Sequence, residues 1–223
     1  METILLKRKL LHVLKKTCEK LWKINKDDSE TGSRLFIPQK NDENRISEQE
    51  LRFAFIESFL EDDSLKEYKF SVETPTKKAY RFTEGGKKIK PECYDDGEDG
   101  RKANTDLTIL SKDNQMVCMI EFKAKNTDFH SHAKDFIKLK KEKETDSKIL
   151  RLFVEIYIRT DNQTLVSIYK KLYKNDCGNI GENTDYVGVT LKHGKEEGWR
   201  FIECNPDACR AVIVCPVKAP DYC

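Results

Sequence analysis

Apolar residues recur at the spacing of an α-helix along the first part of the chain. Between residues 3 and 25 they lie close to the period of one helix face, at Leu6, Leu10, Val13, Leu14, Leu21 and Trp22. Residues 26–34 and 40–45 are polar and predict breaks. The pattern indicates an amphipathic N-terminal helix followed by irregular or extended chain.

A second helix is predicted to begin at Ser47. Ser47 and Glu50 match a capping box, in which the serine caps the first turn and the glutamate reaches back to the serine backbone. The apolar stripe of this helix comprises Leu51, Phe55 and Phe59. At about 100° per residue, Glu48 lies on the side of this stripe and Glu50 does not. Glu48 is therefore the acid that this helix aligns with the protein interior.

Alternating and continuous apolar runs predict a sheet after the second helix. The expected strands are 68–74, 79–82, 104–110, 116–125, 149–158, 186–191, 199–204 and 211–217, and further helices are expected at 133–144 and 165–173. Residues 84–100 are acidic and rich in glycine, and they predict a mobile loop without the ligand spacing of an EF-hand. This order of elements indicates an α/β fold with a sheet flanked by helices.

Composition favours a folded protein with a lean apolar core, since 38% of residues are hydrophobic and 36% are charged. No apolar run approaches the roughly 20 residues that span a bilayer, and charges follow the first apolar triplet at once. We therefore expect no membrane partner, no secretory signal and a cytoplasmic location. Eight cysteines without an export signal favour free thiols, and the late ones lack the C-x-x-C pair of a zinc knuckle.

Charge is nearly balanced, with 41 Lys and Arg against 39 Asp and Glu and a net charge of +2. Any contact with nucleic acid must then come from local basic surfaces. Residues 1–25 and 121–143 are two candidates, although a solvated lysine-rich exterior explains either run taken alone.

The two strands at 104–110 and 116–125 predict a hairpin with candidate chemistry. A symmetric turn at Asp113 and Asn114 places Leu110 opposite Val117, Thr108 opposite Met119 and Asp106 opposite Glu121. Strand alternation adds Lys123 to the face of Asp106 and Glu121. The reverse face is apolar and must belong to the core; it carries Leu107, Ile109, Met116, Cys118, Ile120 and Phe122.

Two carboxylates directly opposite each other on a sheet repel, and a divalent cation between them would remove that cost. Mg²⁺ suits such a pair, because it binds one or two carboxylates together with waters and phosphate oxygens. Lys123 could orient a water molecule or stabilise negative charge on a phosphate. The alternative is structural: Lys123 pairs with an acid at a solvated strand end.

These segments resemble a known family. SEQELRFAF (47–55), NTDLTIL (104–110) and MIEFKAK (119–125), followed by a helix and ILRLFVEIYI (149–158), are similar to the PD-(D/E)XK nuclease superfamily. The resemblance implies a restriction-endonuclease-like αβββαβ core with a mixed central sheet at about residues 46–175. It further implies an N-terminal helical extension at 1–45 and C-terminal β additions within a nuclease domain at 46–223.

The resemblance also implies roles for four residues. Asp106 matches the metal-binding acid, Glu121 the second acid, Lys123 the lysine and Glu48 the helix glutamate, so that Glu48, Asp106 and Glu121 would bind Mg²⁺ or Mn²⁺. Thr105 stands where the family has its name-giving proline, which binds no metal, and no Q-x-x-x-Y motif follows.

The function expected on this basis is metal-dependent hydrolysis of phosphodiester bonds, most readily in DNA, in genome defence, mobile-element biology or repair. The residues expected to contact nucleic acid are Lys125, His130, His132, Lys134, Lys138 and Lys141. A homodimer would allow such an enzyme to cut both strands. Two other readings stay open: a catalytically inactive nuclease-like fold that binds nucleic acid or protein, and an α/β interaction protein with an accidental motif.

Overall fold

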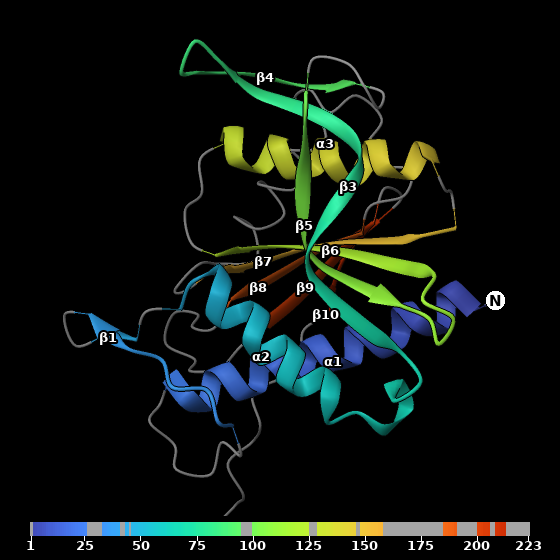
Figure 1. Cartoon of the computed structure of the whole chain (residues 1–223). Coiled ribbons are helices and arrows are strands. Elements are labelled where there is room, and N and C mark those ends of the chain that lie inside the picture. Colours follow the sequence, from blue (N-terminus) through green and yellow to red (C-terminus); the bar gives the residue numbers. More distant parts are fainter. Residues whose placement is uncertain are drawn as a thin grey trace, which may run out of the picture.

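The protein is a mixed α/β fold built on one large curved sheet (Figure 1). The computed structural model describes residues 2–25, 33–40, 43–44, 46–94, 100–124, 129–145, 148–157, 185–190, 200–205 and 208–212. Its helices are α1 (Glu2–Asn25), α2 (Glu48–Leu60), the short 3₁₀ helix η1 (Asp63–Leu65) and α3 (Phe129–Thr145). Its strands are β1 (Gln39–Lys40), β2 (Glu43–Asn44), β3 (Lys69–Glu84), β4 (Lys87–Tyr94), β5 (Arg101–Leu110), β6 (Met116–Ala124), β7 (Leu150–Tyr157), β8 (Asp185–Thr190), β9 (Arg200–Asn205) and β10 (Ala208–Val212).

The described part of the main sheet has eight strands in the order β10-β9-β8-β7-β6-β5-β3-β4. The pairs β6–β7 and β7–β8 are parallel, and the other neighbours are antiparallel. A parallel pair needs a crossover, and α3 supplies it between β6 and β7. The strands β1 and β2 form a separate small ladder.

The apolar core lies between one face of the sheet and the helices α1 and α2, while α3 covers the opposite face (Figure 1). Leu10 and Leu14 of α1 are fully buried in the same cluster as Phe55 of α2 and Phe122 of β6. The rings of Phe55 and Phe122 lie 5.6 Å apart, and burying a phenylalanine contributes roughly 1.5–3 kcal/mol. The helix α1, which was predicted as an N-terminal extension, thus shares the core of the sheet. The predicted boundary between an extension at 1–45 and a domain at 46–223 stays a prediction.

The start of α2 confirms the predicted capping box. The Ser47 side chain accepts a hydrogen bond from the backbone of the first turn, and the Glu50 carboxylate accepts one from the Ser47 backbone N–H at 2.8 Å. These contacts satisfy donors that a helix start leaves free.

The prediction of a loop at 84–100 is wrong for residues 87–94, which form β4. This strand pairs antiparallel with β3 across a turn at Gly85 and Gly86. Both glycines have positive φ, 53° and 77°, which a residue without Cβ adopts at little cost. The two strands predicted at 68–74 and 79–82 are one strand, β3, with an irregularity between Pro75 and Ala79.

Other predictions have mixed outcomes. The predicted strands at 149–158, 186–191 and 199–204 correspond to β7, β8 and β9, and part of 211–217 belongs to β10. The helix predicted at 165–173 lies outside the described residues. Cys18, Cys93 and Cys118 are free thiols, whereas the side chains of the late cysteines lie outside the described part. Among the described helices, none is both long and apolar enough to cross a membrane.

Candidate active site

The hairpin of β5 and β6 has the predicted register over most of its length. Thr108 lies opposite Met119, and Leu107 lies opposite Ile120. The predicted pairing of Leu110 with Val117 is wrong, because an irregularity near the turn shifts Leu110 to Met116.

Asp106 lies one residue beyond the last described pair of this ladder. Its Oδ2 accepts a hydrogen bond from the backbone N–H of Phe122 at 2.8 Å. The carboxylate therefore crosses to β6 next to Glu121, and it is close enough to contribute to the raised pKa of Glu121. Asp106 and Glu121 are near each other on adjacent strands, and their direct pairing across the ladder stays a prediction.

Away from the turn, the two faces of the hairpin behave as predicted, whereas near the turn Val117 packs against the core instead of Met116. Leu107, Ile120 and Phe122 are fully buried in the core under α1 and α2. Glu121 and Lys123 point to the other face, where both contact side chains of α3. The charged face is covered by a helix, so the alternative of a solvated strand end for Lys123 does not hold.

Glu121 is completely buried, and its carboxylate is poorly satisfied. The ammonium Nζ of Lys138 lies 2.8 Å from Oε1, yet neither carboxylate oxygen accepts a well-directed hydrogen bond within the described residues. Burial, and then the charges of Asp135 and Asp106, raise the pKa of Glu121 well above its ordinary value, and Lys138 offsets this only in part. The site therefore holds a buried carboxylate that lacks sufficient positive charge.

Lys123 is held between two acids from different helices. Its Nζ lies 2.7 Å from Oδ2 of Asp135 and 3.2 Å from Oε1 of Glu48. Burial acts to lower the pKa of Lys123, but Asp135, Glu48 and Asp106 outweigh it and raise the pKa. Lys123 is therefore a protonated ammonium at neutral pH, and Glu48 reaches the site as predicted.

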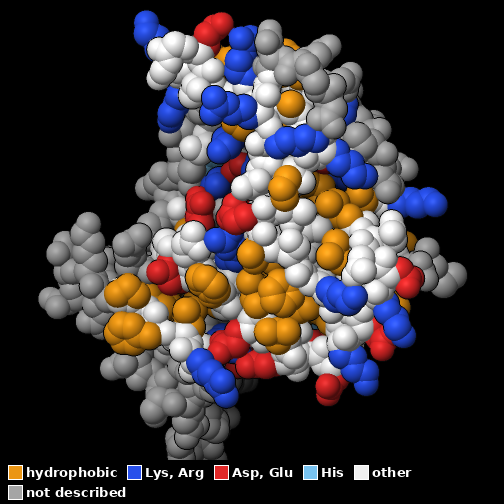
Figure 2. Space-filling model, viewed as in Figure 1, with side chains coloured by type: hydrophobic (Ala, Val, Ile, Leu, Met, Phe, Trp, Pro, Cys, Tyr) orange, Lys and Arg blue, Asp and Glu red, His pale blue; other side chains and the backbone are white. Residues whose placement is uncertain are grey.

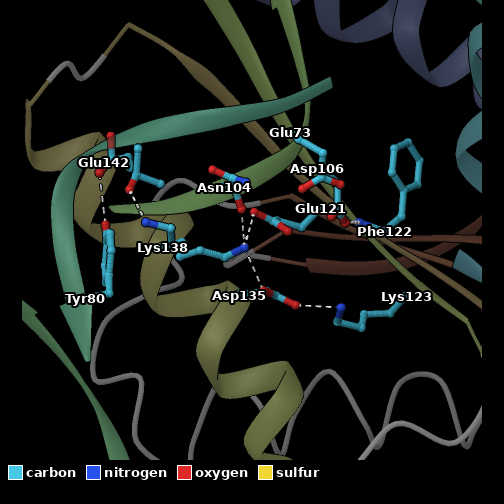
Figure 3. A network of polar contacts seen from close by, with 12 residues as sticks. Glu73, Tyr80, Asn104, Asp106, Glu121, Phe122, Lys123, Asp135, Lys138 and Glu142 are labelled. Atoms are coloured by element: carbon cyan, nitrogen blue, oxygen red, sulfur yellow. Dashed lines mark hydrogen bonds and ion pairs between the residues drawn. The ribbon is translucent and has the colours of Figure 1, made fainter. Parts of the chain in front are cut away.

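Asp135 on α3 joins the two lysines, and it is the residue that sequence patterns did not single out. Its Oδ1 lies 2.8 Å from Nζ of Lys138, and its Oδ2 contacts Lys123 (Figure 3). Burial acts to raise the pKa of Asp135, but the two ammonium groups outweigh it and lower the pKa. An acid three residues before a lysine in a helix is a visible signal, but only packing shows that this face is buried.

The face of α3 toward the sheet carries one buried polar residue per turn, which we call the polar seam: His132, Asp135, Lys138 and Glu142. His132 contacts Glu155 of β7. Lys138 also donates to the backbone oxygen of Asn104 on β5 at 2.8 Å. The helix is thus joined by polar contacts to four neighbouring strands.

Glu142 ends the seam at β3. Its carboxylate accepts hydrogen bonds from the backbone N–H groups of Lys77 and Lys78 at 2.8 and 2.9 Å, and from the Tyr80 hydroxyl at 3.0 Å. These bonds fix the irregular part of β3 to α3 (Figure 3).

The residues predicted to contact nucleic acid are only partly available for it. His132 and Lys138 are buried with carboxylate partners, so an exposed role for them is corrected. Lys134 is half-buried, with its ammonium 5.1 Å from the centre of the Phe82 ring, and Lys141 is half-buried. Lys125 lies outside the described residues, and His130 belongs to α3 rather than to the predicted loop, but its side chain is outside the described part.

The cluster has the charge of a cation site but not a complete set of ligands. With every group ionised, the four acids Glu48, Asp106, Glu121 and Asp135 and the two lysines Lys123 and Lys138 carry a net charge of 2 − 4 = −2. Among the described residues, no three His, Cys, Asp or Glu side chains are arranged to hold a metal ion. Mg²⁺ requires only one or two carboxylates besides water. Glu121, with Asp106 beside it, fits that requirement.

No protein-family model matches the chain, and neither a curated protein nor a solved structure is significantly similar to it.

Proposed function

We propose that this protein is a metal-dependent nuclease that hydrolyses phosphodiester bonds, with DNA as its first candidate substrate. One observation carries the proposal. Glu121 is a fully buried carboxylate in contact with the ammonium of Lys138, next to the acid Asp106 and on the strand of Lys123. Burial of a charged carboxylate lowers the stability of a protein, and a cation bound to this carboxylate would offset that loss.

The arrangement of elements supports the same proposal. The order α2, β3, β5, β6, α3 and β7 agrees with the αβββαβ core that the resemblance implies, with β4 added at the sheet edge. The parallel crossover through α3 follows the strand that carries Glu121 and Lys123. Both helices that would flank such a core reach the site, through Glu48 and Asp135.

The acids and the lysine of this site would have different roles in catalysis. Asp106 and Glu121 would hold Mg²⁺, which when bound acidifies water and neutralises phosphate charge. Lys123 stays protonated because its pKa is raised, so it serves as a cationic donor to a phosphate oxygen rather than as a base. Asp135 and Glu48 hold this ammonium in place. Asp135 is thus a positioning residue.

Basic side chains next to the site support a nucleic-acid substrate. The described side chains of residues 77–94 and 100–102 include seven basic ones and two acidic ones: Lys77, Lys78, Arg81, Lys87, Lys88, Arg101 and Lys102 against Glu84 and Glu92. Both acids pair with Arg81. Figure 2 shows blue side chains gathered over the upper part of the molecule, with acidic side chains just below them. Residues 95–99, which carry four acids, lie outside the described part.

We call the surface formed by these seven basic side chains the hairpin arm. Its excess of positive charge suits the phosphate backbone, which dominates affinity for nucleic acid without regard to sequence. The hairpin arm is therefore the surface that we propose to contact nucleic acid, in place of the lysines and histidines that follow the hairpin of β5 and β6.

The proposal is tested by incubating the purified chain with labelled duplex DNA, single-stranded DNA and RNA in Mg²⁺, Mn²⁺ or EDTA. We expect cleavage that EDTA abolishes and that Asp106→Asn, Glu121→Gln and Lys123→Met each reduce at least about 100-fold, within the range of single catalytic groups. Glu61→Gln is the matched control, because Glu61 pairs with Lys20 away from the site. Cleavage that persists in EDTA or in all three variants would refute the assignment.

A second function has an observation in its favour. Glu121 is covered by α3 and already contacts an ammonium group, which suits a nuclease-like fold that binds nucleic acid without cutting it. Binding in the same assays with no cleavage in either metal would favour this second function over the first.

A further inference from the structure

Lys138 has three oxygen partners at the same short distance. Its Nζ lies 2.8 Å from Oε1 of Glu121, from Oδ1 of Asp135 and from the backbone oxygen of Asn104. The side chain is 4% exposed. A buried ammonium with this many acceptors is firmly placed.

This ammonium contacts a carboxylate that would bind the proposed metal. Glu121 is completely buried, and Lys138 is the cation that contacts its carboxylate among the described side chains. Figure 3 shows Lys138 reaching from α3 toward Glu121 and Asn104.

We propose that Lys138 is a built-in counter-ion of the site, which pairs with Glu121 in the metal-free protein and leaves that carboxylate when a divalent cation binds. This inference rests on the proposed function. It adds a residue on α3 that governs how tightly the site binds metal.

Charge balance supports an exchange of partners. With both lysines counted and every group ionised, the cluster of four acids and two lysines carries a net charge of −2, which one divalent ion would balance. Two of the three acceptors of Lys138, Asp135 and the Asn104 carbonyl, remain available after it leaves Glu121. The flexible stem of a lysine allows such a shift without movement of the helix.

Lys123 provides a matched comparison within the same cluster. It is also a buried ammonium in contact with Asp135, but its second partner is Glu48 rather than Glu121. If a lysine weakened metal binding only through its general positive charge, removal of either lysine would have a similar effect.

The test measures Mn²⁺ affinity by calorimetry and electron paramagnetic resonance, without substrate, for the unaltered chain, Lys138→Met, Lys138→Arg and Lys123→Met. We expect Lys138→Met to bind Mn²⁺ about tenfold more tightly or better, since a competing charge in direct contact with the carboxylate is gone. Lys138→Arg should retain the weaker binding. Lys123→Met should tighten binding by a clearly smaller factor.

Three results would overturn the inference. Equal tightening in both methionine variants would show a general charge effect, and weaker binding in Lys138→Met would show that Lys138 helps to hold the metal. In both cases the proposed metal site survives. Absence of Mn²⁺ binding in every form, Lys138→Met included, would instead remove the metal site and the proposed function with it.

A second measurement uses the unaltered chain, in case Lys138→Met does not fold. The rate of acylation of Lys138 is followed by mass spectrometry in EDTA and in saturating Mn²⁺, with Lys123 as the internal reference. Release from Glu121 predicts faster acylation of Lys138 relative to Lys123 when Mn²⁺ is present. An unchanged or lower ratio contradicts the release.

Discussion

Nζ of Lys123 on β6 lies 2.7 Å from Oδ2 of Asp135 on α3, and both side chains are buried. This pair joins the strand that carries the motif to the helix that covers it. It also explains why Lys123 can be buried in its charged form, because the carboxylate beside it raises the pKa of the ammonium. The integrity of the site therefore depends on a residue outside the motif.

Asp135→Asn should destabilise the protein strongly. The substitution leaves two buried lysines without their shared carboxylate, and breaking a buried ion pair costs about 3–5 kcal/mol. We expect the free energy of unfolding, measured in urea, to fall by about 3 kcal/mol or more. Glu61→Gln is the control: Glu61 is half exposed and pairs with Lys20, so a loss under about 1 kcal/mol is expected. Equal effects of the two variants would contradict a central role for Asp135.

Glu121→Gln should stabilise the protein at neutral pH. The pKa of Glu121 is raised in the folded state, so the native protein binds more protons than the unfolded chain above the ordinary pKa of about 4.3. Stability due to this group then falls as the pH rises toward the folded pKa. We expect the variant and the unaltered chain to have similar unfolding free energies near pH 4, and the stability advantage of the variant to grow as the pH rises above that value. Parallel curves from pH 4 to 8 would contradict the raised pKa.

Reversal of charge on the hairpin arm should weaken binding to nucleic acid. Lys87 and Lys88 are exposed on β4, and each lost phosphate contact lowers affinity and flattens its dependence on salt. We expect Lys87→Glu with Lys88→Glu to weaken binding to duplex DNA, in EDTA, by about tenfold or more. Lys66→Glu with Lys112→Glu is the matched control, at the other end of β3. A similar loss in both double variants would show that the arm has no special part.

Glu142→Ala should loosen the attachment of β3 to α3. The carboxylate accepts bonds from two backbone N–H groups, at Lys77 and Lys78. Without it, hydrogen exchange at these two amides should become about tenfold faster or more, because a hydrogen bond to a charged group is worth about 1.5–3 kcal/mol. Tyr80→Phe removes the hydroxyl that also donates to this carboxylate and keeps both amide bonds. It should leave the exchange of Lys77 and Lys78 nearly unchanged.

Sequence patterns predicted the features of the fold that depend on interactions between residues close together in the chain. The capping box at Ser47 and the register of Thr108 with Met119 follow from spacing alone, and both are present. The pairing of Leu110 failed because the register depends on turn geometry. Asn114 adopts a φ of 60° in that turn, which apolar alternation does not reveal.

Other features depend on contacts between distant segments. The strand β4 has no apolar alternation, since it pairs with β3 at the sheet edge and exposes Lys87 and Lys88. Lys123 and Glu48 were found from the motif and the helix period, and they are in contact, whereas Glu121 contacts Lys138. Asp135 and the buried state of Lys138 could not be found, because only the packing of α3 on the sheet turns a lysine-rich helix face into an interior one.

The polar seam also fixes where α3 can lie along the sheet. A helix with a purely apolar stripe packs about equally well on a sheet after it slides by one turn along its axis. A helix with this polar seam does not. A slip that brought Asp135 to the position of Lys138 would place two carboxylates together at Glu121. Alternation of sign along the helix thus excludes neighbouring alignments, as buried polar residues do in helix pairs that must choose one register. The order of charges on α3 therefore determines that Lys123 and Lys138 each lie beside a carboxylate.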